Sequence, residues 1–205
     1  MRIAIDIDGT LNTVYYDTLN YYKEFIREFD SSSGIILSEY EFKNRFRFDK
    51  DDYESFMRIY FPKIVKESKL LPYVKETIHE LHNHHELICI TSRDAEFNRP
   101  YQPYTGKQMV VDTLGWFVQN DLPFNMSNTY FSVKNKGEKC RELNVDIMID
   151  DNPSHIKECI DNQVTCYFPI YPFNRYYTVF TNKYIHPMYS GWIDLLKFAN
   201  KNLYQ

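Results

Sequence analysis

Short apolar segments rich in β-branched residues recur along the chain and alternate with helical patterns. They cover residues 2–6, 86–91, 129–133, 145–150 and 164–170. Each has the length of a single strand. Between them the apolar residues follow helical spacing, as in Val74, Ile78 and Leu81. Apolar strands that alternate with helices indicate a parallel sheet covered by helices on both faces. The predicted fold is therefore α/β, a Rossmann-like three-layer sandwich with a central parallel sheet.

The interval from about 12 to 72 interrupts this alternation. It shows no strand pattern, and Leu19, Tyr22 and Phe25 follow one helical stripe. Fourteen aromatic residues lie between Tyr15 and Phe61. An interruption of this length is too long for an ordinary loop. We therefore expect a helical cap subdomain over 15–72, inserted after the first strand, and a core domain formed by 1–14 and 73–205.

Composition narrows the class of protein and of partner. The 205 residues carry 24 Lys and Arg against 28 Asp and Glu, for a net charge of −4, which does not favour binding to extended nucleic acid. No apolar run approaches the roughly 18–20 residues of a membrane span, so we expect no membrane anchor. The four cysteines form no CxxC pair, which indicates a reducing cytoplasm. A homodimer is left open.

Paired carboxylates follow two of the predicted strands. Asp6 and Asp8 end the first strand, and Asp151 follows Asp150 at the end of another. Asp8 with Gly9 is also typical of a simple turn, and an aspartate before Pro153 can cap a helix. The carboxyl ends of parallel strands meet at one sheet edge. Four carboxylates there would repel one another without a cation, and Mg²⁺ is the ion that best suits oxygen ligands.

Hydroxyl and cationic side chains are expected at the same edge. Thr91, Ser92 and Arg93 follow the second long strand, where hydroxyls, free amides and a guanidinium suit phosphate oxygens. Taken alone, this tripeptide more often belongs to a surface loop with a solvated arginine. A lysine is also expected near the carboxylates, and Lys136 is preferred because a helix begins there. The alternatives are Lys134 and Lys139.

In their order, these motifs resemble those of the haloacid dehalogenase superfamily of phosphohydrolases. DIDGT at 6–10, Thr91 with Ser92, Lys136, and the strand that ends in Asp150 and Asp151 match its four motifs. The insertion after the first motif resembles a helical cap of that superfamily. Within it, the spacing from Lys136 to Asp150 and the segment YPFNR at 171–175 are most similar to the 5′(3′)-deoxyribonucleotidase-like family and its bacterial relatives.

The resemblance implies a mechanism for the carboxylates. Asp6 would attack phosphorus and form an aspartyl-phosphate, and Asp8 would act as general acid and then as general base. Mg²⁺ would be held by Asp6, the Asp8 backbone carbonyl and Asp150, with support from Asp151. The implied activity is a Mg²⁺-dependent phosphomonoester hydrolase, and nucleoside monophosphates are the favoured small-molecule substrates. Dehalogenases of the superfamily lack the second aspartate, so Asp8 favours phosphate esters.

The resemblance also implies the phosphate ligands. Thr91, the Ser92 amide and Lys136 would hold phosphate oxygens, and Arg93 is a further candidate. Arg93 stands where the mammalian deoxyribonucleotidases have proline, so the geometry of this loop is expected to differ from theirs.

Other residues are weaker candidates for substrate contacts. Phe46, Phe48 and Tyr53 could stack on a nucleobase, although aromatic residues at helical spacing more often form a core. Lys107 and Arg175 could reach the substrate. The alternative functions are a phosphatase for sugar phosphates or nucleic-acid ends, and a non-catalytic phosphate-binding module.

Overall fold

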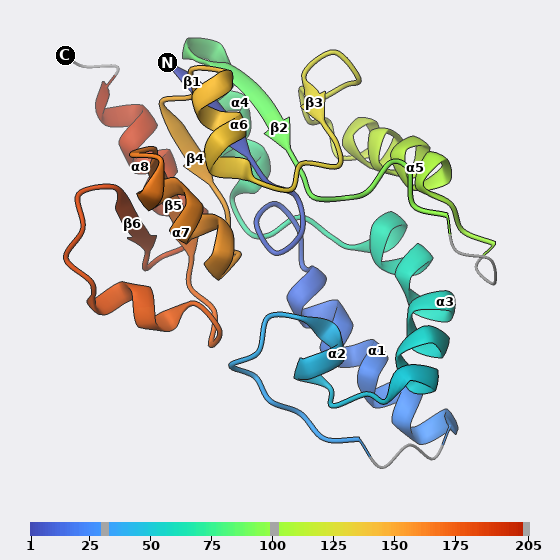
Figure 1. The fold of residues 1–205 in the computed structure, drawn as a ribbon. Coiled ribbons are helices and arrows are strands. Elements are labelled where there is room, and N and C mark those ends of the chain that lie inside the picture. The colour runs from blue at the N-terminus through green and yellow to red at the C-terminus, as the bar shows by residue number, and fades with distance from the viewer. Residues whose placement is uncertain (30–32, 99–102, 203–205) are drawn as a thin grey trace.

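A parallel sheet of six strands forms the centre of the molecule (Figure 1). The computed structural model describes residues 1–29, 33–98 and 103–202. The strand order is β3-β2-β1-β4-β5-β6, and every neighbouring pair is parallel. The strands are β1 Arg2–Ile5, β2 Glu86–Ile90, β3 Thr129–Tyr130, β4 Ile147–Ile149, β5 Thr165–Pro169 and β6 Ile185–Met188.

Helices cover both faces of this sheet. One face packs against α4 Val74–His84, α5 Gly106–Gln119 and α8 Trp192–Asn202, and Ile3, Ile5 and Leu87 point into this layer. The opposite face packs against α6 Lys136–Glu142 and α7 Pro153–Asp161, where Ala4, Ile88 and Met148 are buried. Successive residues of β1 thus enter different layers, as a strand buried on both faces requires. The predicted three-layer α/β fold is confirmed.

Strand register brings the expected motifs together. Ile5 of β1 lies opposite Cys89 of β2 and Ile149 of β4. The backbone amide of Asp6 donates to the carbonyl of Ile149 at 2.9 Å. The residues that follow these three strands therefore emerge at one edge of the sheet.

Two strands differ from the sequence-based prediction. The segment predicted as a strand over 129–133 keeps only two strand residues, because Ser132 adopts a left-handed φ of 57°. Strand β6 was not predicted, since His186 and Pro187 interrupt its apolar pattern. Because β6 is an edge strand, a proline that cannot donate a backbone hydrogen bond is tolerated there.

Three helices lie between β1 and α4 and gather beyond one end of the sheet (Figure 1). They are α1 Val14–Phe29, α2 Phe42–Arg45 and α3 Lys50–Glu67. Asp49 caps α3 by accepting from the amide of Asp52 at 2.8 Å. A separate aromatic core that includes Phe25 and Phe56 joins the three helices. We propose that 15–72 form a cap subdomain, with 1–14 and 73–205 as the core domain.

A short 3₁₀ helix, η1 Arg175–Val179, follows β5. None of the helices in the described ranges is long and apolar enough to cross a lipid bilayer.

Candidate active site

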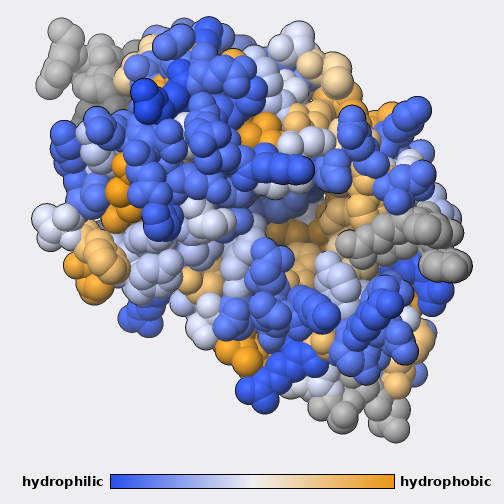
Figure 2. Space-filling view, in the orientation of Figure 1, coloured by the Kyte–Doolittle hydropathy of each residue, from blue (hydrophilic) through white to orange (hydrophobic). Residues whose placement is uncertain are grey.

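A pocket of about 460 Å³ lies between the three inserted helices and the carboxyl ends of the strands. Figure 2 shows the hollow, with hydrophobic residues exposed inside it. Its core wall includes Asp6, Asp8 and Lys136, and its cap wall includes Tyr53 and Phe61. A volume of this size suits a small-molecule substrate.

The loop after β1 places two carboxylates in the pocket. Asp6 is buried and Asp8 is partly exposed. Gly9 has a φ of +77°, and a Cβ atom at this position would lie 2.3 Å from Oδ2 of Asp151. The turn therefore needs glycine both for its left-handed backbone and for the close approach of Asp151.

Lys136 is the cation that meets the carboxylates. Its fully buried Nζ lies 2.5 Å from Oδ1 of Asp6 and 2.7 Å from Oδ2 of Asp150. Asn135 caps α6 by accepting from the amide of Glu138 at 3.0 Å, which fixes the start of the helix on which Lys136 stands. Lys134 is exposed, and Lys139 pairs with Glu142 at 2.6 Å. Of the three candidate lysines, Lys136 alone contacts these carboxylates.

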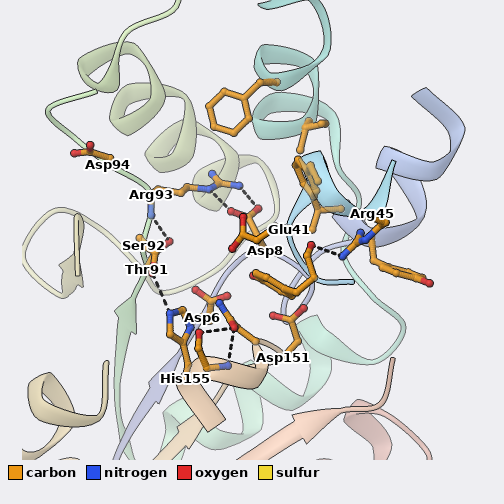
Figure 3. A pocket seen from close by; sticks show the side chains of 18 of the residues that line it. Asp6, Asp8, Glu41, Arg45, Thr91, Ser92, Arg93, Asp94, Asp151 and His155 are labelled. Atoms are coloured by element: carbon orange, nitrogen blue, oxygen red, sulfur yellow. Dashed lines mark hydrogen bonds and ion pairs between the residues drawn. The ribbon is translucent and has the colours of Figure 1, made fainter. Parts of the chain in front are cut away.

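Arg93 forms an ion pair with Asp8, the second carboxylate of the loop after β1. Its Nε and Nη2 atoms donate to the two carboxylate oxygens of Asp8 at 2.8 and 2.6 Å (Figure 3). Its Nη1 donates to Oγ1 of Thr113 at 2.7 Å. Burial alone would raise the pKa of Asp8, but the charge and hydrogen bonds of Arg93 outweigh it and lower that pKa. Arg93 also lines the pocket. Protein groups engage three of its five N–H donors, and its contact with phosphate stays a prediction.

Thr91 and Ser92 stand at the end of β2, beside the carboxylates. Thr91 is buried, and its Oγ1 accepts from the amide of Arg93 at 3.2 Å. Ser92 is exposed to the pocket, and its hydroxyl lies 3.0 Å from the carbonyl of Val133. Both predicted hydroxyl residues therefore line the pocket.

His155 is a pocket residue that the sequence analysis missed. It lies in the first turn of α7 and is 6% exposed. Its Nδ1 is 3.1 Å from Oδ2 of Asp150, and its Nε2 is 3.4 Å from Oγ of Ser92. Its position five residues after Asp150, just inside a helix that begins with proline, was the available signal.

The charges of the site do not balance. Four carboxylates, those of Asp6, Asp8, Asp150 and Asp151, face three permanent cations. Lys136 and Arg93 pair with them directly, and Arg45 lines the same pocket without such a pair. Burial raises the pKa of Asp6, Lys136 lowers it, and the result is a pKa of about 6. Burial and the neighbouring Asp150 and Asp6 carboxylates raise the pKa of Asp151 well above its ordinary value.

A divalent cation fits this excess of negative charge. Asp6, Asp150 and Asp151 each offer an oxygen atom, and these atoms all lie within 4.8 Å of one another. A buried set of oxygen donors with surplus negative charge suits a hard ion such as Mg²⁺.

Of the weaker candidates for substrate contacts, only Tyr53 belongs to the pocket lining. Phe46 and Phe48 instead belong to the aromatic core of the cap, where the ring of Phe46 stacks on Tyr22 at 4.5 Å. Lys107 and Arg175 are exposed and do not belong to the pocket lining. The structure thus places two of these four residues in the cap core and two at the surface outside the pocket lining, and their contact with a substrate stays a prediction.

Arg45 is a second pocket residue that was missed. It is 2% exposed, and it donates to the carbonyls of Glu39 and Tyr40 at 2.8 and 2.7 Å. Its guanidinium lies 5.0 Å from the ring centre of Tyr15 and 5.2 Å from that of Phe173. The aromatic contacts and backbone acceptors explain how a charge is accommodated inside the cap.

The segment YPFNR connects the two acidic loops. The hydroxyl of Tyr171 donates to the carbonyl of Gly9 at 2.8 Å, and Nδ2 of Asn174 donates to the carbonyl of Asp151 at 2.8 Å. Phe173 lines the pocket. This segment therefore holds the backbones of both loops.

Comparison with solved structures identifies the fold. A haloacid dehalogenase-like family hydrolase of Streptococcus pneumoniae superposes with a TM-score of 0.67 at 14% identity, over 96% of this chain and 97% of that one. The chain has the haloacid dehalogenase-like fold. A predicted phosphatase of Clostridium acetobutylicum shares this fold with a TM-score of 0.62 at 17% identity, over 100% of this chain and 98% of that one. The fold that the resemblance of the four motifs implies is thus confirmed.

Sequence comparison adds one relative. A nucleotidase of Clostridium acetobutylicum is 26% identical over 155 residues, which cover 74% of this chain and 71% of that protein. No protein-family model matches the chain.

Proposed function

We propose that this chain is a Mg²⁺-dependent phosphatase that hydrolyses small phosphomonoesters through an aspartyl-phosphate on Asp6. One observation carries the proposal. Asp6 stands in the pocket with one oxygen held by Lys136 and with Asp8 two residues further on. In a haloacid dehalogenase-like fold, this arrangement supplies a nucleophile, a cation for the phosphoryl group and a second carboxylate for proton transfer.

The chain's own residues account for both displacements. Asp6 forms a bond to phosphorus while the bond from phosphorus to the ester oxygen breaks, and Asp8 passes a proton to that oxygen. Water then attacks phosphorus while the bond from phosphorus to Asp6 breaks, and Asp8 takes a proton from that water. The phosphate that leaves carries this proton away, so both carboxylates return to their charged forms. The ion pair with Arg93 favours the charged form of Asp8, which is the form required for the second step. A substrate bound as the monoanion supplies the proton that Asp8 passes to the ester oxygen in the first step, because the second pKa of a phosphomonoester is about 6.

Asp6, Asp150 and the backbone carbonyl of Asp8 would hold Mg²⁺, and Asp151 would support that set. When bound, the ion supplies charge neutralisation and polarisation of the phosphoryl group. Thr91 and the amide of Ser92 would bind phosphate oxygens, because both residues border the pocket beside Asp6.

Nucleoside monophosphates, deoxyribonucleotides in particular, are the proposed substrates. The cap wall of the pocket carries the aromatic rings of Phe42, Tyr53 and Phe61, and stacking of a base on such a ring contributes about 1–3 kcal/mol. The relative at 26% identity is named a nucleotidase. Sugar phosphates and nucleic-acid ends are the competing substrates, and the aromatic wall suits them less well.

The test is phosphate release from nucleoside monophosphates, sugar phosphates and an aryl phosphate, measured with Mg²⁺ and with EDTA. We expect Mg²⁺-dependent turnover that Asp6→Asn abolishes, with nucleotides ranked first. Equal turnover by Asp6→Asn would exclude the aspartyl-phosphate.

A non-catalytic phosphate-binding module is the alternative from another class. Asp8→Asn separates the two, because an enzyme loses about 10²–10⁴-fold in turnover with its general acid–base and still binds phosphate. A parent protein that binds phosphate and hydrolyses nothing would support the module. We also propose a reducing compartment for the activity, since Cys89, Cys140, Cys159 and Cys166 are buried free thiols.

A further inference from the structure

His155 touches two parts of the site that different strands contribute. It lies in α7, whose N-terminus is fixed by Asn152, which accepts from the amide of Ser154 at 2.9 Å. The first turn of this helix therefore returns over the end of β4. Figure 3 shows the ring beneath Ser92, which stands at the end of β2. His155 is the side chain that bridges these two strand ends, by contacts to Asp150 and Ser92.

The contact with Asp150 has a defined direction. An ionised carboxylate can only accept hydrogen bonds, so Nδ1 of His155 carries the proton. It lies 3.2 Å from Oδ1 and 3.1 Å from Oδ2. Oδ1 also accepts from the amide of Asn152 at 2.8 Å, and Oδ2 accepts from Lys136 at 2.7 Å. Both carboxylate oxygens are thus held in place by donors from the protein.

The other ring nitrogen faces the phosphate-binding loop. Nε2 lies 3.4 Å from Oγ of Ser92, whose single hydrogen is donated to the carbonyl of Val133 at 3.0 Å. With the proton on Nδ1, this second contact is packing of the ring against the loop.

We propose that His155 is a positioning residue that orients the Asp150 carboxylate toward the cation. This inference rests on the proposed function. Partners that orient a metal ligand typically contribute 10- to 100-fold to metal affinity or activity.

Titration calorimetry of Mn²⁺ binding to the full chain, without substrate, tests this role of His155. Asn places an amide nitrogen near the position of Nδ1, and Gln places one near Nε2. We expect His155→Asn to bind Mn²⁺ within about twofold of the parent, and His155→Gln and His155→Ala to bind about 10- to 100-fold more weakly. His82→Asn, at an exposed position of α4, is the matched control and leaves the affinity unchanged.

Thermal unfolding of each variant separates positioning from folding. The Asn and Gln variants are expected to melt at similar temperatures while their Mn²⁺ affinities differ, so their comparison stands even where Ala fails to fold. Equal Mn²⁺ affinity in the Asn and Gln variants would overturn the role of Nδ1. A parent that neither binds Mn²⁺ nor releases phosphate would overturn the proposed function, and this inference with it.

Discussion

Replacing Lys136 by Met removes the one positive charge between two buried carboxylates. The ammonium lies 2.5 Å from Asp6 and 2.7 Å from Asp150, and all three side chains are at most 6% exposed. Met fills a similar volume, so packing is preserved while the charge is lost. Asp6 and Asp150 then remain buried without this partner.

The expected loss follows from the burial. Removing one partner of a buried ion pair costs about 3–5 kcal/mol, because the remaining charge is uncompensated. The cost for two carboxylates is less than twice this value, because protonation relieves part of the repulsion between them. For a chain of this length each kcal/mol lowers the melting temperature by about 2–4 °C. The Lys136→Met variant should therefore melt about 6–20 °C below the parent in EDTA.

Urea and thermal unfolding, in EDTA and in Mg²⁺, measure this difference. The deficit should shrink in Mg²⁺, because the ion neutralises the same carboxylates. Lys139→Met is the matched control, since Lys139 forms an exposed pair with Glu142 and such pairs contribute less than about 1 kcal/mol. A Lys136→Met variant as stable as the parent in EDTA, or no more affected than Lys139→Met, would refute the reasoning.

Three further substitutions test other parts of the structure. Gly9→Ala should destabilise the fold by at least about 1–2 kcal/mol, because the left-handed φ of +77° disfavours a side chain and the new Cβ meets Asp151; equilibrium urea unfolding checks this value. Phe46→Ala should cost about 3–5 kcal/mol in stability by opening a cavity in the cap core, and an unchanged melting temperature would show that Phe46 is not a core residue. Arg93→Lys should lower kcat/KM about 10- to 100-fold, since an ammonium lacks the planar fork that forms two parallel hydrogen bonds to Asp8; steady-state kinetics with an aryl phosphate measure it.

The fold was largely predictable because buried parallel strands leave a strong signal. Residues 3–5 and 87–90 are continuous apolar runs, and both belong to strands inside the sheet. Strand β6 escaped prediction because an edge strand needs no such run and tolerates Pro187. The shortening of β3 depends on the left-handed backbone of Ser132, which no local composition indicates.

The meeting of the carboxylates was also predictable, because parallel strands bring their carboxyl ends to one edge. The structure places Asp6, Asp150 and Asp151 within reach of one ion and Lys136 between two of them. Pairing between side chains was harder to foresee. Arg93 and Asp8 are 85 residues apart, and their contact depends on how far β2 extends past β1.

In the cap, the sequence pattern does not show whether a side chain points into the core or into the pocket. Phe46 and Tyr53 belong to the same aromatic-rich stretch, yet Phe46 is buried in the cap core and Tyr53 lines the pocket. Arg45 lies next to Phe46 and resembles a surface residue in the sequence, although it is 2% exposed. Helix α2 has four residues, too few for a periodic pattern to assign its faces.

The contacts of the YPFNR segment have a consequence for synthesis on the ribosome. The loop that carries Asp6 and Asp8 is made first, but its backbone is held by Tyr171 at Gly9 and by the indole of Trp192, which donates to the carbonyl of Thr10 at 2.8 Å. Asn174 holds Asp151 in the same way. A nascent chain that has emerged only as far as Asp151 thus contains all four acidic residues but lacks these restraints. The acidic loops gain all three restraints only after the chain has left the exit tunnel as far as Trp192.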